Sequence, residues 1–261
     1  MSNAITIKNC KVVNEGQILE KDILIKNGRF EKITDEISSE GEIIDAAGLF
    51  LMPGIIDDQC HFREPGLTER GSIKTESLSA IAGGTTSFMD MPNVLPPTLN
   101  LDLWRDKINI GKQSASANFS FYMGTSNTNI DEIKAIDPKE VCGIKIFMGS
   151  STGDLHVDSE EALNDLFKES PVIITTHCED DPMIKAMEKQ FLAQYGEKIP
   201  VEMHSEIRSR EACLKSSKKA IELATRNNAN LHILHLTTKE EIELFSNKPL
   251  SEKTITAEVC I

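Results

Sequence analysis

Histidines follow or end three short apolar segments that have the length and composition of β-strands. His61 follows residues 54–60, His177 ends residues 172–177, and His235 lies near the end of residues 230–236. An imidazole nitrogen is a common ligand of zinc and other transition metals. A single histidine on a strand is more often a core residue with satisfied hydrogen bonds, but several at strand ends indicate a shared site. These residues are therefore candidate metal ligands.

The segment before His61 determines which side chains can reach that site. Alternate residues of a strand share a face, so Gln59 and His61 point the same way while Cys60 points to the other side. By the same rule His232 and His235, three residues apart, lie on opposite faces, and a packing role is expected for His232. Gln59 offers a neutral carbonyl oxygen, which is a poor ligand for zinc. The sequence thus places a weak ligand beside a strong one.

Strands that alternate with helices would position these residues. Strand patterns occupy residues 54–60, 85–91, 118–124, 143–148, 172–177, 230–236 and 254–260. Helical patterns lie between them, among others at residues 72–82, 159–168, 180–194, 206–227 and 239–247. This alternation predicts a parallel sheet. Seven strands are one fewer than a (β/α)8 barrel has, and in such barrels the active site lies at the carboxyl ends of the strands.

Composition excludes several classes of function. The chain has 261 residues, a formal net charge of −13 and 39% hydrophobic residues, which suits one large α/β domain with an appendage. The charge and the lack of basic clusters argue against nucleic acid and anionic membranes as partners. No apolar run has the length of a membrane span and no signal peptide is evident, so we expect a cytoplasmic protein. The six cysteines form no CxxC pair, which favours reduced thiols.

Two motifs carry a resemblance to a known family. Residues 53–66 read PGIIDDQCHFREPG, and residues 91–93 read MPN. With the histidines at strand ends, they resemble the dihydroorotase branch of the cyclic amidohydrolase superfamily over nearly the whole chain. The resemblance implies an α/β fold, with a small β-domain over residues 1–50 that is part of a β-sandwich and a (β/α)8-type amidohydrolase barrel over residues 51–261. Because the last strand pattern stops near Ile261, we expect the barrel to lack its eighth strand.

The resemblance also implies roles for single residues. The family's metal ligands correspond to His61, Lys145, His177 and His235, and its substrate-binding pair corresponds to Arg63 and Asn93. Lys145 matches a lysine that relatives carboxylate with CO2, since a buried lysine held neutral can form a carbamate that bridges two metals. Gln59 takes the place of the first histidine of the family's His-x-His pair, so we expect one zinc where the intact family holds two. The family's catalytic aspartate would lie beyond the chain end, and no catalytic residue is assigned.

By resemblance, the ancestral activity interconverts dihydroorotate and carbamoyl aspartate in pyrimidine biosynthesis. A guanidinium holds a carboxylate through two parallel hydrogen bonds, so Arg63 and Asn93 would anchor the carboxylate of dihydroorotate. We expect this chain itself to be inactive, because of Gln59 and the absent aspartate.

Two alternatives stay open. One is a non-catalytic scaffold that associates with an aspartate carbamoyltransferase or an active homologue. The other is an active hydantoin or allantoin hydrolase, which Arg63 and Asn93 disfavour because those rings lack the matching carboxylate. A homodimer would be ordinary for the family.

Overall fold

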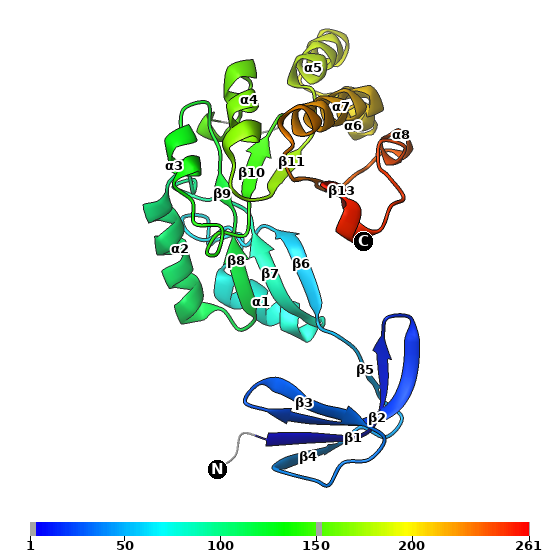
Figure 1. Cartoon of the computed structure of the whole chain (residues 1–261). Coiled ribbons are helices and arrows are strands. Elements are labelled where there is room, and N and C mark those ends of the chain that lie inside the picture. Colours follow the sequence, from blue (N-terminus) through cyan, green and yellow to red (C-terminus); the bar gives the residue numbers. More distant parts are fainter. Residues whose placement is uncertain (1–3, 150–152, 261) are drawn as a thin grey trace. The chain divides into compact units, whose positions relative to one another are not determined.

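The computed structural model describes residues 4–149 and 153–260 (Figure 1). Ile261, near which the last strand pattern stops, lies outside the described residues. Contacts between residues group the chain into two compact units, Met1–Ile55 and Ile56–Ile261. Each unit has its own sheets and its own buried clusters, so each is described by itself.

The first unit is a single sheet. Its strands are β1 (Ala4–Asn14), β2 (Gln17–Lys26), β3 (Arg29–Thr34), β4 (Glu42–Asp45) and β5 (Phe50–Leu51). The order is β3-β2-β1-β4, and β5 also pairs with β1. The antiparallel β2–β3 pair turns at Asn27 and Gly28, both at positive φ (51° and 72°), as a two-residue hairpin turn requires.

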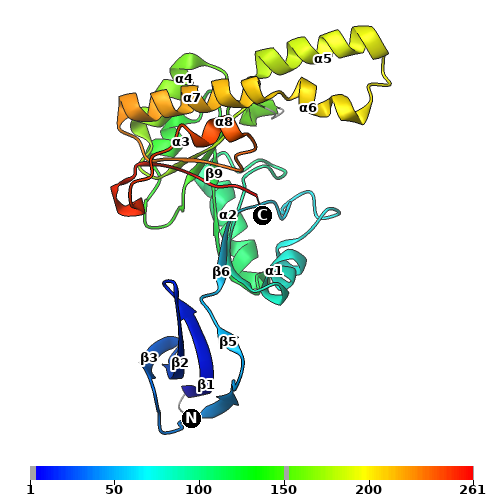
Figure 2. The same ribbon diagram turned by 90° about the vertical axis from the view of Figure 1, so that its right-hand side faces the viewer.

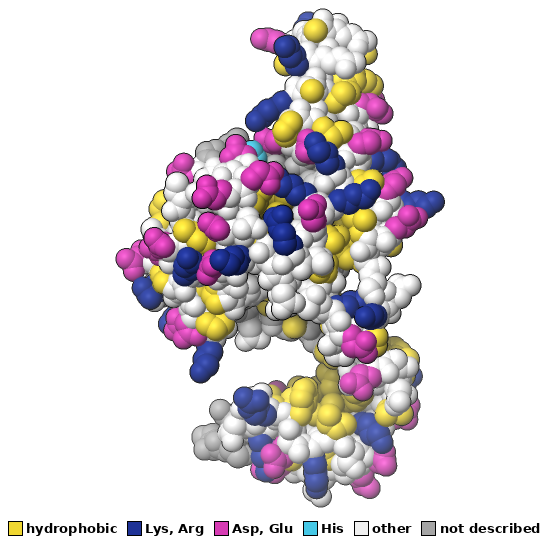
Figure 3. Space-filling view, turned by 45° about the horizontal axis from the view of Figure 1, so that its top comes forward, with side chains coloured by type: hydrophobic (Ala, Val, Ile, Leu, Met, Phe, Trp, Pro, Cys, Tyr) yellow, Lys and Arg dark blue, Asp and Glu magenta, His cyan; other side chains and the backbone are white. Residues whose placement is uncertain are grey.

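Much of the apolar surface of this first unit faces outward. Phe30, Ile33 and Phe50 are 66%, 53% and 57% exposed, and Figure 3 shows hydrophobic side chains gathered on this unit. Its buried clusters are small, one of them formed by Cys10, Ile23 and Ala46. The described residues of the unit therefore form one sheet and not two packed sheets, and its membership of a β-sandwich stays a prediction.

The second unit carries the strand–helix alternation. Its strands are β6 (Ile55–Cys60), β7 (Thr85–Asp90), β8 (Asn118–Phe121), β9 (Met123–Gly124), β10 (Ile144–Phe147), β11 (Ile174–His177), β12 (Leu231–Ile233) and β13 (Ile255–Ala257). They form two sheets, ordered β6-β7-β8 and β9-β10-β11-β12-β13. Only Tyr122 separates β8 from β9, so the described strands occupy seven successive positions in chain order. The predicted seven strands and the parallel pairing from β7 to β13 are confirmed.

Helices pack along the strands of the two sheets, while α5 projects outward beyond α7 (Figures 1 and 2). The longer ones are α1 (Ile73–Ala82), α2 (Leu101–Ser114), α4 (Glu160–Glu169), α5 (Asp181–Tyr195) and α7 (Arg210–Asn227). The shorter ones are α3 (Ile130–Lys134), α6 (His204–Ile207) and α8 (Lys239–Ile242). The main hydrophobic core lies between these helices and the strands. Since side chains alternate along a strand, Ile144 and Ile146 enter that core while Lys145 faces the other side of the sheet.

Two helical segments differ from the sequence prediction. The single helix expected over residues 206–227 is divided, because Arg208 leaves the helical region (φ −96°, ψ 69°) and Ser209 caps the start of α7 with its side chain. The helix expected over residues 239–247 is the short α8. Among the described residues, no helix is both long and apolar enough to cross a membrane.

Candidate active site

His177 and His235 come together at the carboxyl ends of neighbouring strands. His177 is the last residue of β11, and His235 lies two residues beyond β12. The Nδ1 atom of His177 is 3.2 Å from the Nε2 atom of His235, and the ring centroids are 4.9 Å apart. Two nitrogens bound to one tetrahedral zinc, at bond lengths of about 2.0–2.1 Å, would be separated by about 3.4 Å. The pair therefore fits one metal ion without rearrangement.

An irregular backbone turns His235 toward His177. His235 has a φ of +39°, a left-handed conformation that is uncommon for a residue with a side chain. Glu258 holds this turn from the next strand: its backbone bonds Ile233 and Leu236, and its Oε1 accepts the His235 N–H at 3.3 Å. The backbone hydrogen bonds of Glu258 thus continue the pairing before and after His235. His235 itself bulges out of this pairing toward His177.

A buried carboxylate supports His177 from behind. Oε2 of Glu179 lies 2.6 Å from Nε2 of His177, and the Glu179 side chain is 8% exposed. Arg208 bonds both oxygens of this carboxylate, with its Nε 2.8 Å from Oε1. A carboxylate on one imidazole nitrogen fixes the ring and its tautomer, which leaves the other nitrogen for a ligand. In this arrangement Nδ1 of His177 carries the lone pair, and it faces Nε2 of His235.

Lys145 is the buried base of the site. Its residue exposure is 1%, and burial lowers the pKa of its ammonium to about 7. Burial lowers the pKa values of His61 and His235 to about 4, and the charge of Lys145 adds to this lowering. A lysine with this pKa is partly neutral near pH 7, and only the neutral amine can react with CO2. Lys145 is the second of four residues in β10.

His61 follows β6 and has an amide at each ring nitrogen. Its Nε2 is 3.1 Å from the amide nitrogen of Gln59, and its Nδ1 is 2.8 Å from Oδ1 of Asn93. The predicted common face of Gln59 and His61 is thus confirmed. Burial, together with the charge of Arg63, lowers the pKa of His61 to about 4, so the ring is neutral at physiological pH.

The loop after His61 is shaped by its own motif. Arg63, at a φ of 67°, bonds the backbone oxygen of Asn93 at 3.3 Å. Glu64 accepts the Ile73 N–H at 2.7 Å and so caps the start of α1. A side chain on Gly66 would lie 2.0 Å from the backbone oxygen of Leu95, so only glycine fits there. These contacts place Arg63 beside Asn93, as the resemblance implied.

An ion pair beneath this loop links it to a helix. Asp90 at the end of β7 and Lys107 of α2 are both completely buried, with Nζ and Oδ2 2.6 Å apart. The other oxygen of Asp90 accepts the Phe62 N–H at 2.7 Å, and Lys107 donates to the Met91 carbonyl. Asp90 therefore holds the backbone of the loop through the Phe62 N–H and is itself neutralised by Lys107.

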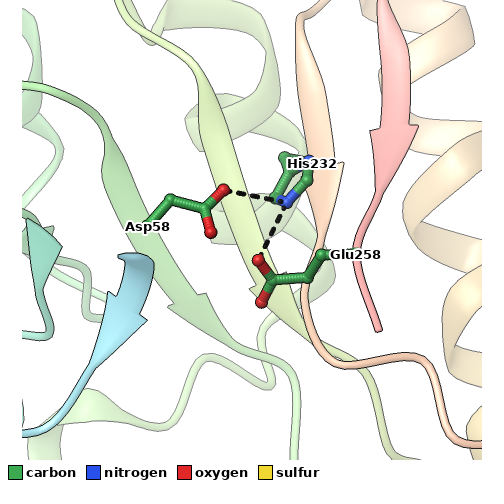
Figure 4. Close-up of side chains that lie close together, drawn as sticks. All are labelled: Asp58, His232 and Glu258. Atoms are coloured by element: carbon green, nitrogen blue, oxygen red, sulfur yellow. Dashed lines mark hydrogen bonds and ion pairs between the residues drawn. The ribbon is translucent and has the colours of Figure 1, made fainter. Parts of the chain in front are cut away.

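A second polar cluster also includes a histidine. Asp58 of β6, His232 of β12 and Glu258 after β13 converge, and Nε2 of His232 is 3.6 Å and 3.4 Å from the two carboxylates (Figure 4). Their ligand-type atoms all lie within 4.8 Å of one another. Burial, aided by Glu258, raises the pKa of Asp58 to about 6. Thr256 and Glu258 bond the two ring nitrogens of His232, and Asp58 lies at ion-pair distance, so its surroundings are polar.

A cavity of about 720 Å³ opens beside the histidine pair. It is lined by His177, Glu179, Arg208 and His235, with Thr237 among its polar wall residues. This volume is within the range of small-molecule sites. The cavity thus gives a ligand access to the nitrogens that face each other.

The remaining histidines and the cysteines contribute little to this site. His204 is exposed, although it lines the outer wall of the cavity, and His156 lies 3.7 Å from a carboxylate oxygen of Asp181. The six cysteines are all unpaired, as the sequence predicted.

Comparisons with known proteins agree with this geometry. No family model matches the chain. The chain is 31% identical over 244 residues to a dihydroorotase of Methanosarcina acetivorans, an alignment that covers 91% of the chain and 51% of that protein. It is 30% identical to an L-hydantoinase of Paenarthrobacter aurescens, over 92% of the chain and 54% of that protein. An allantoinase of Bacillus velezensis is 28% identical over the whole chain and 58% of its own length.

The solved structure of an L-hydantoinase from Arthrobacter aurescens superposes with a TM-score of 0.90 at 27% identity, covering 98% of this chain and 58% of that one. The chain thus spans about half the length of the relatives that it matches. Its fold is that of an α/β barrel. Its histidines lie at the carboxyl ends of the strands, where proteins of this class have their sites. Within that class, the chain belongs to the cyclic amidohydrolase superfamily.

Several site residues were not predicted from the sequence. Glu179 and Arg208 support His177, and Glu258 supports His235, but none of them was singled out as functional. Glu179 lies two residues after His177, so period-two alternation could have indicated that both side chains face the same way. Arg208 and Glu258 are distant in sequence, and no local pattern identifies them.

Proposed function

We propose that this chain supplies the metal and substrate site of a dihydroorotase-like hydrolase, which opens a cyclic amide bearing a carboxylate. The observation that carries the proposal is the 3.2 Å approach of His177 and His235 beside the buried Lys145. Zinc would be held by these two imidazoles and by Lys145 as a carbamate. Bound zinc would supply Lewis-acid polarisation of the ring amide carbonyl.

The substrate's carboxylate would be held by Arg63 and Asn93. These residues are adjacent, because the Arg63 guanidinium donates to the backbone oxygen of Asn93. A guanidinium with free N–H groups and a neighbouring amide form a site that prefers a planar anion. This preference supports dihydroorotate, whose ring carries a carboxylate, over hydantoin and allantoin.

Hydantoin and allantoin remain the second candidate substrates, because relatives named L-hydantoinase and allantoinase match at similar identity. The test is binding of dihydroorotate, hydantoin and allantoin to the zinc-loaded chain by calorimetry, with Arg63→Ala as the variant. We expect dihydroorotate to bind more tightly than the other two, and Arg63→Ala to weaken it about ten- to hundredfold, as for the loss of a charged hydrogen bond. Equal binding of all three, unaffected by Arg63→Ala, would refute the substrate assignment.

A further inference from the structure

His61 is engaged on both sides of its ring by amide side chains. An amide nitrogen carries only hydrogens and cannot accept a hydrogen bond, whereas an amide oxygen can only accept. Nε2 of His61 faces the amide nitrogen of Gln59 at 3.1 Å, so it must carry a lone pair. Nδ1 faces the amide oxygen of Asn93 at 2.8 Å, so it must carry the hydrogen. A single neutral tautomer satisfies both contacts.

This tautomer also fixes the amide of Asn93. Because the Asn93 oxygen accepts from His61, its NH2 group points away from the ring and can donate elsewhere. Arg63 bonds the backbone oxygen of the same asparagine. A guanidinium at the Asn93 backbone and the NH2 of the Asn93 side chain are then two donors from adjoining groups. That is the arrangement a carboxylate requires.

We propose that Gln59 acts in place of a metal ion at His61: its N–H occupies the Nε2 lone pair, holds His61 in the Nδ1–H tautomer, and so orients the NH2 of Asn93 as a substrate donor. Gln59 and His61 are then positioning residues for carboxylate binding, and His61 is not a metal ligand in this chain. Only the statement about the substrate rests on the proposed function.

The chemistry of position 59 explains why glutamine suits this role. A metal ion on Nε2 would leave the hydrogen on Nδ1, and a donated N–H does the same. Glutamate has the same shape but can only accept, so it would draw the ring hydrogen to Nε2 and leave Nδ1 with the lone pair. Asn93 would then have to turn its NH2 toward His61 and its oxygen toward the substrate. A carboxylate substrate would meet an oxygen where it needs a donor.

The inference is tested by long-range proton–nitrogen correlation NMR of the imidazole nitrogens, in the whole chain treated with a chelator. The His61 signals are assigned by their loss in His61→Gln. We expect a protonated Nδ1 and an unprotonated Nε2 in the unaltered chain. In Gln59→Glu we expect the two to exchange, whereas Gln59→Met, which removes the donor without adding an acceptor, should give a mixture. A protonated Nε2 in the unaltered chain would overturn the inference.

Zinc and ligand titrations complete the test. One equivalent of zinc should shift the signals of His177 and His235 and leave Nε2 of His61 unchanged; a coordination shift at His61 would overturn the inference. Gln59→Glu should weaken binding of dihydroorotate about ten- to hundredfold, with Gln59→Met as the milder control. If Arg63→Ala weakens binding but Gln59→Glu does not, the orientation of Asn93 is wrong. If the unaltered chain does not bind dihydroorotate, the proposed function is wrong. The tautomer of His61 is still decided by the NMR experiment alone.

Discussion

The two sides of the candidate site use histidine in different ways. His177 and His235 face each other with ring nitrogens 3.2 Å apart, and a carboxylate holds the far nitrogen of His177. His61, in contrast, is bonded at both nitrogens by neutral amides, those of Gln59 and Asn93. The first arrangement leaves lone pairs that a cation can share, and the second leaves none. Histidines in similar sequence positions thus acquire their roles from their neighbours.

The largest expected effect concerns the scaffold under the His61 side. Lys107→Met leaves Asp90 as an unpaired charge in the core, and we expect a loss of about 3–5 kcal/mol in the free energy of unfolding, measured with urea. Asp90→Asn combined with Lys107→Met should recover part of this loss, because the asparagine oxygen can still accept the Phe62 N–H. A loss under about 1 kcal/mol would show that the pair is not the anchor of this side. Zinc binding by the folded variant should be unchanged.

A smaller effect is expected on the His177 side. Glu179→Gln keeps the shape of the side chain but removes the charge that orients His177, and we expect the dissociation constant for zinc to rise about 10–100-fold. The matched control is Glu240→Gln, because Glu240 also pairs with an arginine, Arg210 at 3.2 Å, but its side chain is 48% exposed. Competition with a zinc-binding dye measures both. Equal zinc affinities in Glu179→Gln and Glu240→Gln would show that Glu179 does not support zinc binding.

The smallest effect concerns the cluster of Asp58, His232 and Glu258. The pKa of Asp58 is raised to about 6, so between about pH 4 and 6 the folded chain holds a proton that the unfolded chain has released. This contribution to stability is complete below about pH 4 and is lost as the pH rises through 6. Its size is at most about 1 kcal/mol, because the carboxylate is 46% exposed and screened. In Asp58→Asn, the free energy of unfolding measured with urea should not decline between pH 4.5 and 6.5. A decline identical to that of the unaltered chain would show that other groups cause it.

The strands were predictable because local patterns define them. Buried parallel strands are short apolar segments, and residues 143–148 and 172–177 contain β10 and β11. Helix α2 was not among the predicted helices, because its buried face carries Lys107 and Gly111 with Trp104 and so interrupts the apolar periodicity. Lys107 is buried only because Asp90 meets it, and Gly111 is required because a side chain there would lie 2.6 Å from Phe119. Such reasons are visible only in the folded chain.

The same limit applies to the site. The positions of His61, His177 and His235 at strand ends follow from strand patterns, and the pairing of Arg63 with Asn93 follows from the family resemblance. The support of His177 by Arg208 joins residues 31 positions apart through Glu179, and no periodicity encodes it. The contact of Gln59 with His61 was predictable in direction, but the contact of His61 with Asn93, which sets the tautomer, depends on how two loops meet.

Zinc stoichiometry tests the difference between the two sides most directly. The chain and its variants Gln59→His and His177→Ala are loaded with zinc in bicarbonate buffer, dialysed, and measured by atomic emission. We predict about one zinc per chain in the unaltered protein, close to none in His177→Ala, and an increase toward two in Gln59→His, because histidine at position 59 releases Nε2 of His61 for coordination. Two tightly held zinc ions in the unaltered chain, or a content that His177→Ala leaves unchanged, would contradict this account.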